Sequence, residues 1–290
     1  MAFRLSRRGA LTSDARRLAD EELGSAIDRL DDASQAADLR VHAARKSIKR
    51  VRALLRLVRA VMTPGRFREH NAALRDAARG LSAARDAAVA LATFDALIPG
   101  PDALLTAVRS DLAARRGDTG GVEDAVLVAA AQALRAARAP LLADLGAIDW
   151  AIVEAGLRDS YGGGREAMRA ALAGDGGHDD DAFHDWRKRA KDLWYQCQLL
   201  RDICPGLLGA LEGMLAHLGD LLGEDHDLAV LQASAPASPA LHARIVERHQ
   251  ELRADAWRVG QRVYAERPQA FLRRMRAYWR TWRSNEPGAA

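Results

Sequence analysis

Hydrophobic and polar residues follow one another along this 290-residue chain with the 3.6-residue period of amphipathic α-helices, and the alternation typical of strands is nearly absent. Ala, Leu, Arg, Glu and Asp dominate, and all of them are compatible with helices. The pattern predicts an all-α protein with helices at about 13–31, 38–62, 66–94, 101–116, 122–139, 147–173, 181–203, 206–233, 238–267 and 268–284.

Proline and glycine mark the expected breaks between these helices. The breaks lie at Pro64-Gly65, Pro99-Gly100-Pro101, Gly117 to Gly121, Pro140, Gly174 to Gly177, Pro205-Gly206 and Pro236. Gly162-Gly163-Gly164 is expected to mark a further break inside the helix at 147–173. We expect Asp38 to cap the second helix, and Pro239 and Pro268 to open the last two.

A basic phrase that begins with histidine occurs twice. The copies are His42-Ala-Ala-Arg45-Lys46-Ser-Ile-Lys49 and His184-Asp-Trp-Arg187-Lys188-Arg-Ala-Lys191, which are 142 residues apart. A weaker match follows each copy, with Arg85-Asp86 corresponding to His226-Asp227 at an offset of 141 residues. Two ordered matches at nearly one offset predict an internal duplication.

Each phrase lies on one face of its predicted helix. With His42 at zero and about 100° per residue, the cations of the first copy fall within roughly 80° of it. These cations are Arg45, Lys46, Lys49, Arg52 and Arg56, and Arg50 belongs to the same basic run. Apolar residues such as Ile48 and Val51 lie on the opposite face. In the second copy Trp194, Tyr195 and Gln198 continue the basic face.

The first basic face is too positive for an ordinary solvated helix surface. Between Asp38 and Arg59 there are eight Lys or Arg residues and one acid. Like charges three and four residues apart destabilise an isolated helix, so an external polyanion or an acidic surface is expected to neutralise them. The second copy contains Asp185 and Asp192, and its charge is more dilute.

The amino-acid composition indicates the overall charge of the protein and the compartment in which we expect it. The formal net charge is +4, the pI is about 9.4, and hydrophobic residues make up 49% of the chain, enough for a large core. The two cysteines, Cys197 and Cys204, are expected to be buried thiols in a reducing compartment. No apolar stretch of membrane-spanning length and no signal core are apparent, so we expect a cytoplasmic protein without a membrane contact.

Long helices with short connections predict antiparallel bundles. We expect one domain of residues 1–290 with an internal repeat at about 10–140 and a second at about 141–284, the boundary lying near 140–146. If the two bundles are related by a pseudo-twofold rotation, their basic faces line a shared central channel.

The doubled phrase resembles the CHAD domain, the conserved histidine α-helical domain. That family carries two copies of a His-x-x-Arg phrase that continues into Lys and Arg, and a Gly-x-x-(His or Arg)-Asp segment that Gly223, His226 and Asp227 match here. The resemblance covers about residues 10–283. It implies helical bundles around a basic channel that binds inorganic polyphosphate, association with polyphosphate granules and their proteins, and no cofactor.

Carried over to this chain, the resemblance implies a set of polyphosphate-binding residues. They are His42, Arg45, Lys46, Lys49, Arg50, Arg52, Arg56, Arg85, His184, Arg187, Lys188, Lys191 and His226. Asp192, Trp194 and Gln198 stand where the first copy has Arg50, Arg52 and Arg56, so the second basic face is shorter. Some family members are fused to a triphosphate-tunnel hydrolase with a Glu-x-Glu-x-Lys pattern, which this chain lacks. We therefore expect a stand-alone binding module that is not an enzyme.

Two alternatives stay open. A nucleic-acid binder would share the cationic face, but the first basic helix has no aromatic residue for stacking on bases. A helical metal-dependent phosphohydrolase could use His184, His217, His226 and Asp227 as ligands, but the repeat places Arg85 where His226 stands.

Functional interpretations of several other features have less support. Gly162 to Gly164 followed by Arg165 lacks the strand and the Lys-Ser/Thr end of a phosphate loop, and Ser160 and Cys197 have no apparent catalytic base. The C-terminal run of Arg273, Arg274 and Arg276 with nearby tryptophans fits a packing helix better than a nucleic-acid or membrane contact.

Overall fold

The computed structural model describes residues 3–81, 83–100, 102–118, 123–173 and 179–284, and within them it contains eleven α-helices and no strand. The helices are α1 (Leu11–Asp31), α2 (Ala37–Leu57), α3 (Pro64–Gly80), α4 (Ala83–Leu97), α5 (Thr106–Asp118), α6 (Asp124–Asp144), α7 (Trp150–Ala173), α8 (Asp180–Leu199), α9 (Pro205–Ser234), α10 (Pro239–Val263) and α11 (Pro268–Ser284). The 3₁₀ helices η1 (Arg59–Val61) and η3 (Arg201–Ile203) follow α2 and α8. The all-α prediction is confirmed.

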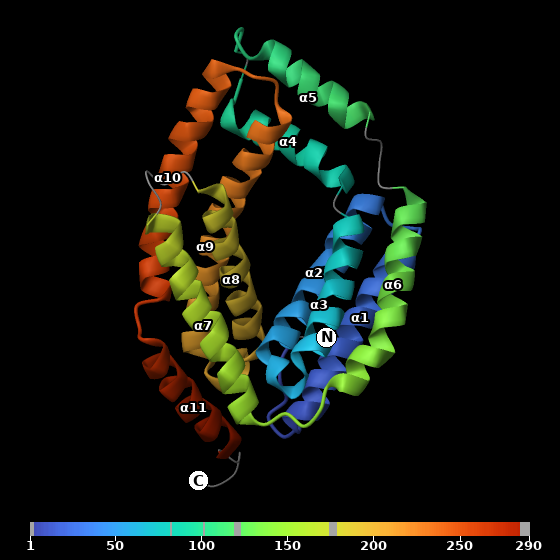
Figure 1. The fold of residues 1–290 in the computed structure, drawn as a ribbon, viewed down its shortest axis with the longest axis vertical. Coiled ribbons are helices and arrows are strands. Elements are labelled where there is room, and N and C mark those ends of the chain that lie inside the picture. The colour runs from blue at the N-terminus through green and yellow to red at the C-terminus, as the bar shows by residue number, and fades with distance from the viewer. Residues whose placement is uncertain (1–2, 82, 101, 119–122, 174–178, 285–290) are drawn as a thin grey trace.

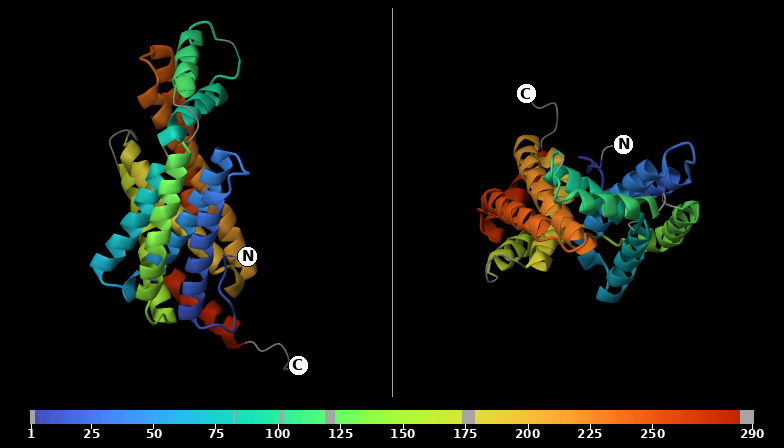
Figure 2. Two further views of the ribbon diagram at one scale, coloured as in Figure 1. Left: turned by 90° about the vertical axis from the view of Figure 1, so that its right-hand side faces the viewer. Right: turned by 90° about the horizontal axis from the view of Figure 1, so that it is seen from above.

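The helices form two groups that stand beside each other (Figure 1). In the first, α1 packs against α2 and α6, and α3 packs against α2 and α6. In the second, α8 packs between α7 and α9, and α10 covers α9. Figure 2 shows α4 and α5 at one end of the elongated molecule, next to parts of α9 and α10.

The two groups meet where α2 contacts α7 and α8. A Cβ atom at Gly156 on α7 would lie 1.9 Å from the carbonyl oxygen of Leu57, so only glycine allows the backbones to approach this closely. Beside this crossing, the side-chain amide of Gln196 on α8 donates to the carbonyl of Ala53 on α2 at 3.3 Å. The close crossing holds the two basic helices, α2 and α8, beside each other.

Two apolar clusters stabilise this arrangement. The larger joins both groups and includes Ile48 on α2 and Trp186 on α8, both fully buried. The smaller lies between α4, α5, α9 and α10 and includes Phe94 and Leu228. Helices of the expected first repeat therefore pack on helices of the expected second repeat, so the repeats do not form separate cores.

Several helix starts have the local chemistry that the sequence suggests. Pro239 lies in the first turn of α10, with the Ser238 hydroxyl accepting from the Leu241 amide, and Pro268 is the first residue of α11. The prediction that Asp38 caps α2 is wrong. Ala36 occupies that position without a side-chain cap, and Asp38 lies in the first turn, where its charge favours the helix dipole.

Two predictions about where helices end are also wrong. The single helix expected at 66–94 is divided into α3, which ends at Gly80, and α4, consistent with the low helix propensity of glycine. The break at Pro140 does not occur. Helix α6 continues through it to Asp144, and Leu141 is fully buried beyond the proline.

The expected break at Gly162 to Gly164 is wrong as well, because α7 runs through all three glycines. A Cβ atom at Gly164 would lie 2.4 Å from the Tyr264 hydroxyl, and one at Gly163 would lie 3.6 Å from the Arg189 guanidinium. Gly164 therefore lets α7 pack closely against Tyr264, and this tertiary packing outweighs the low helix propensity of the glycines.

The expectation that no apolar stretch has membrane-spanning length is wrong for α6. This is the one helix of the described residues long and apolar enough to cross a membrane by length and composition. Its Arg138 pairs with Asp20 on α1 at 2.6 Å, and Arg135 pairs with Asp31 of α1. These pairs and its contacts with α1 and α3 make α6 a packed helix of the first group.

Helix α11 packs against α7, as the packing interpretation of its arginines requires. Arg276 pairs with the buried carboxylate of Glu154 at 2.6 Å, and Arg274 pairs with Glu266. Trp279 stacks on Trp150 with ring centroids 4.7 Å apart. These arginines contribute to packing between elements.

Candidate functional site

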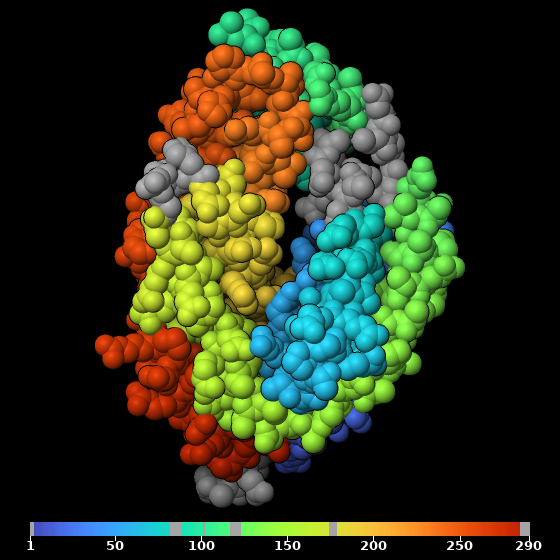
Figure 3. Space-filling model, viewed as in Figure 1, coloured from blue at the N-terminus to red at the C-terminus, as the bar shows by residue number. Residues whose placement is uncertain are grey.

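A cationic cavity of about 570 Å³ lies where α2, α8 and α9 face one another, with Val89 of α4 at its edge. We call it the basic cavity. Its lining is His42, Arg45, Lys46, Lys49, Val89, Arg187, Lys191, Trp194, Tyr195, Asp220, His226, Asp227 and Val230. Figure 3 shows the molecule hollowed between the segments of α2–α3 and α8–α9. Both copies of the basic phrase therefore contribute to one cavity.

Positive charge predominates among the described lining residues. Five Lys or Arg side chains face two carboxylates, Asp220 and Asp227, and two histidines. All the α2 cations come from one face of the helix, whose opposite face buries Ile48 and Val51. The amphipathic pattern of α2 thus directs its positive charge into the cavity.

Helix α2 supplies His42, Arg45, Lys46 and Lys49. Arg45 is half-buried, and its Nη1 donates to the carbonyl of Ala78 on α3 at 2.7 Å. His42, Lys46 and Lys49 are exposed. Arg45 is therefore held by a neighbouring helix, and Lys46 and Lys49 are long, exposed side chains in the cavity lining.

The remaining cations of the α2 phrase lie outside the lining of the basic cavity. Arg50 points toward α1, where its Nη1 bonds to Glu22 at 2.8 Å. Arg52 donates to Asn71 on α3 at 3.1 Å, and Arg56 pairs with Asp192 on α8 at 2.8 Å. Burial, and after it the positive charge of the neighbouring Arg56, lowers the pKa of Arg52 to about 10. The structure thus assigns Arg50, Arg52 and Arg56 contacts within the protein.

Helix α8 supplies Arg187 and Lys191, and two glycines on α9 make room for them. A Cβ atom at Gly219 would lie 2.6 Å from Cε of Lys191, and one at Gly223 would lie 3.4 Å from Nη2 of Arg187. Both cations therefore lie along the surface of α9. Small residues on α9 are what allow the second phrase to reach the cavity.

Lys191 has a mixed environment. Its Nζ lies 3.6 Å from an oxygen of Asp220 and 4.9 Å from the centroid of the Trp194 ring. Burial lowers the pKa of Lys191, and the carboxylate of Asp220 acts in the opposite direction. Lys188, by contrast, is exposed, pairs with Asp185 and is outside the cavity lining.

His184 on α8 and His226 on α9 form a pair of rings at the cavity. Their centroids are 4.3 Å apart at an interplanar angle of 34°, and only His226 belongs to the cavity lining. Nδ1 of His184 is buried without a hydrogen-bond partner. Burial lowers the pKa of His184 to about 4, and the nearby charges of His226, Lys188 and Arg187 act in the same direction. The two repeated histidines thus differ, since His42 is exposed.

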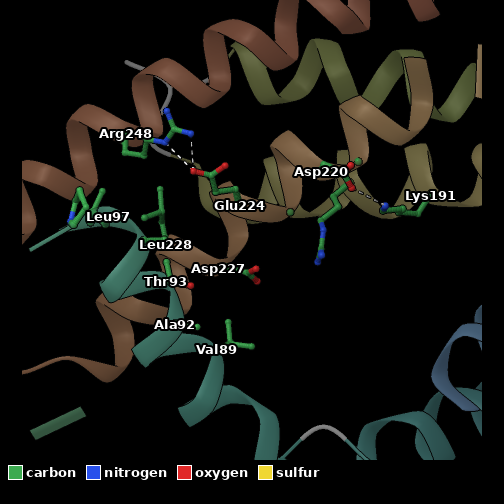
Figure 4. A pocket seen from close by; sticks show the side chains of 15 residues that line it. Val89, Ala92, Thr93, Leu97, Lys191, Asp220, Glu224, Asp227, Leu228 and Arg248 are labelled. Carbon is green, nitrogen blue, oxygen red and sulfur yellow. Dashed lines mark hydrogen bonds and ion pairs between the residues drawn. The ribbon is translucent and has the colours of Figure 1, made fainter. Parts of the chain in front are cut away.

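The side chains of Arg85 and Asp86 lie outside the described residues, so their expected roles stay predictions. Their counterparts His226 and Asp227 both line the basic cavity. Asp227 also lines an adjoining cavity of about 720 Å³ (Figure 4). Both cavities are also lined by Val89, Arg187, Lys191 and Asp220, so the two cavities are neighbours.

The four side chains that the metal-dependent alternative would use as ligands do not form one site. His217 and His226 both belong to α9 but are nine residues apart, which places them about 180° from each other around the helix. No group of three or more metal-ligating side chains occurs among the described residues. Cys197 is fully buried, and burial raises the pKa of its thiol well above the ordinary value, so it is not an activated nucleophile.

Asp220 and Gly219 on α9 are site residues that sequence reasoning missed. Asp220, Gly223 and Asp227 are spaced three and four residues apart, which is one face of a helix. This spacing, with the small residue Gly219 beside it, indicates a helix face that approaches charged side chains closely.

A sequence model of the CHAD domain matches residues 17–236, which is most of the 290-residue chain. The chain therefore belongs to the CHAD domain family, as the doubled histidine phrase indicates. No curated protein matches the chain significantly. The match includes α2, α8 and α9, which form most of the basic cavity, and ends before α10 and α11.

Proposed function

We propose that this protein binds inorganic polyphosphate in the basic cavity and has no catalytic activity. The observation that carries the proposal is the convergence of Arg45, Lys46 and Lys49 from α2 with Arg187 and Lys191 from α8. Five cations around one cavity can neutralise successive phosphates of one chain and release the counterions bound to it. Membership of the CHAD family supports the same ligand, because that family is associated with polyphosphate.

The chemistry of the cations suits a chain of bare phosphates. The planar guanidinium groups of Arg45 and Arg187 can donate two parallel hydrogen bonds to phosphate oxygens, whereas Lys46, Lys49 and Lys191 act as mobile point charges. Such a set requires repeated negative charge but no particular shape between the phosphates. Polyphosphate offers one negative group for each repeating unit.

Nucleic acid is the second candidate, and the aromatic residues of the cavity argue against it. Base stacking needs an accessible ring face. Tyr195 is only 5% exposed, and Lys191 already lies over the ring of Trp194. Nucleic acid would therefore gain the phosphate contacts without the stacking that normally accompanies them.

A pseudo-twofold relation between the helix groups, with a central channel between them, is part of the proposal. Its support is the similar pattern of neighbours in the two groups, α1 with α2 and α7 with α8. His42 and His184 also occupy similar places, in the second turns of α2 and α8. In this interpretation residues 10–140 and 141–284 are the repeats, and one polyphosphate chain contacts both.

The proposal extends to location. A cytoplasmic protein with this site would be recruited to polyphosphate granules by the polymer itself. Contacts with other granule proteins would then follow from sharing one ligand.

A competition experiment tests the proposal. A fluorescent polyphosphate bound to the full chain is displaced by unlabelled polyphosphate, single-stranded DNA or RNA, compared at equal phosphate concentration. We expect polyphosphate to displace the probe at lower concentration than either nucleic acid. Equal or better displacement by DNA or RNA would support the nucleic-acid alternative, and no binding of the probe would contradict the proposal.

A further inference from the structure

The adjoining cavity of about 720 Å³ differs in character from the basic cavity, although the two share Arg187 and Lys191. One wall comes from α4 and consists of Val89, Ala92, Thr93, Ala96 and Leu97. These positions follow the i, i+3, i+4, i+7, i+8 pattern of one helix face. The opposite face of α4, which includes Phe94, packs into the smaller apolar cluster, and Leu97 at the edge of the open face also packs partly against it. Helix α4 therefore presents a second, largely apolar face to the open space (Figure 4).

The part of the lining that comes from α8, α9 and α10 carries both positive and negative side chains. Arg187, Lys191 and Arg248 alternate there with Asp220, Glu224 and Asp227. The Nε of Arg248 donates to Glu224 at 2.8 Å, and Lys191 lies near Asp220, as Figure 4 shows. The cations closest to the basic cavity are Arg187 and Lys191, the residues common to both linings.

A bare phosphate chain is poorly matched to this second space. Phosphates gain nothing from the aliphatic groups of Val89 and Leu97, and three carboxylates offset the charge of the three cations in this lining, whereas the basic cavity has five cations and two carboxylates. The matching ligand has phosphates at one end, for Arg187 and Lys191. At its other end it has an uncharged, partly apolar group whose N–H or O–H groups can donate to carboxylates.

We propose that this second space binds the nucleoside end of a nucleoside triphosphate whose phosphates lie at Arg187 and Lys191. The base would cover the α4 face around Val89 and Leu97, and amino or ribose hydroxyl groups would donate to Asp227. The volume lies within the several-hundred-Å³ range of small-molecule sites, which combine an apolar wall with a few polar groups. This inference rests on the proposed function only in assigning phosphate binding to Arg187 and Lys191.

Titration calorimetry of the full chain with ATP, GTP and tripolyphosphate, in EDTA at neutral pH, tests the inference. Tripolyphosphate has the same number of phosphates but one more ionisable end, so a purely electrostatic site binds it at least as tightly as ATP. We expect ATP and GTP to bind about tenfold tighter, the gain from burying roughly 55 Å² of apolar surface. Equal or weaker binding of both nucleotides, or no binding of any of the three, overturns the inference.

Variants of the α4 wall locate the effect. In Ala92→Gln/Ala96→Gln, two exposed alanines gain polar bulk without charge, and the nucleotide advantage over tripolyphosphate is expected to disappear while polyphosphate affinity is unchanged. Ala243→Gln/Ala254→Gln, at exposed positions of α10 outside both cavities, is the matched control and should keep the advantage. An advantage that survives in the α4 variant contradicts the placement of the nucleoside.

Asp227→Asn separates this inference from the proposed function. Loss of one negative charge from the shared wall should raise polyphosphate affinity, whereas loss of the carboxylate acceptor should lower the nucleotide advantage. Polyphosphate that fails to bind the unmodified protein would contradict the proposed function and leave the comparison of ATP with tripolyphosphate readable. A nucleotide advantage that Asp227→Asn leaves unchanged would contradict the donor contacts.

Discussion

His184 on α8 and His226 on α9 hold their imidazole rings 4.3 Å apart beside a cavity lined by five Lys or Arg side chains. Two protonated rings at this distance would repel each other, and the surrounding cations add to the repulsion. A bound polyanion would have the opposite effect, because it favours the protonated form. The pair therefore links the charge of the cavity to the protonation of the protein.

The first prediction concerns pH. The pKa of His184 in the fold is about 4, below its ordinary value of 6.5, so the unfolded chain takes up this proton first. Stability should therefore fall as the pH falls from about 6.5 toward 4, and polyphosphate should reduce the loss. Denaturant unfolding at several pH values measures both effects. His184→Gln should make the dependence shallower, and the exposed His217→Gln should not; equal slopes for the wild type and His184→Gln would contradict this prediction.

A second prediction separates stability from binding at α9. Gly219→Ala should stabilise the helix by about 0.5–1 kcal/mol, because alanine has the higher helix propensity. Its Cβ would lie 2.6 Å from Cε of Lys191, so the end of that flexible side chain must move and polyphosphate affinity should drop. Gly213→Ala on the same helix has no atom within 4 Å of the new Cβ and should give the stability gain alone. Thermal unfolding and titration calorimetry measure the two quantities, and similar affinities for the two variants would show that Lys191 is not positioned by Gly219.

Asp220 is expected to weaken polyphosphate binding. Its carboxylate lies 3.6 Å from Nζ of Lys191 and competes with phosphate for that cation. Asp220→Asn should raise affinity by up to about fivefold, since an exposed pair contributes roughly 1 kcal/mol or less. Asp255→Asn breaks a surface pair with Arg258 outside both cavities and is the charge-matched control. Equal effects of the two changes would point to net charge instead of a local competition.

The salt dependence of polyphosphate affinity measures how many cations contact the ligand. Five contacts give a slope of log affinity against log salt of about −3.5, at roughly 0.7 per contact for a flexible single strand. Arg187→Ala/Lys191→Ala should make this slope shallower by about 1.4, whereas Lys188→Ala should leave it unchanged because Lys188 is outside the cavity lining. A near-zero slope for the unmodified protein, or a large change with Lys188→Ala, would mean that another surface binds the chain.

Helical spacing explains why part of the site could be predicted from the sequence. His42, Arg45, Lys46 and Lys49 share one face of α2 whatever surrounds the helix, and the repeated phrase identified Arg187 and Lys191 on α8. The pattern could not predict which cations of the basic run lie outside the cavity, in contact with neighbouring helices. Arg50, Arg52 and Arg56 continue the same basic run, but Glu22 on α1, Asn71 on α3 and Asp192 on α8 bind them.

Tertiary contacts also account for the fold features that the sequence misplaced. Pro140 and the three glycines of α7 read locally as helix breaks, yet Leu141 is fully buried and Tyr264 packs against Gly164, so both helices continue. The packing of α4 and α5 on α9 and α10 joins segments far apart in the chain, which no local period reveals. The local sequence pattern predicts which segments are helical and which helix faces are apolar or charged. Contacts with neighbouring helices determine where each helix ends and which helices pack together.

The most direct test of the central claim is the polyphosphate affinity of Arg45→Ala/Lys46→Ala/Lys49→Ala. Its matched control is Arg262→Ala/Arg273→Ala/Arg280→Ala, which removes the same charge from exposed positions of α10 and α11 outside both cavities. Arg274 and Arg276 are unsuitable for the control because they pair with Glu266 and Glu154. Circular dichroism should show unchanged helix content in both variants. We predict at least about 100-fold weaker binding for the α2 variant, since each charge-assisted contact contributes roughly 1.5–3 kcal/mol, and nearly unchanged binding for the control. Equal weakening in the two variants would show that overall charge binds polyphosphate and would contradict the basic cavity as its site.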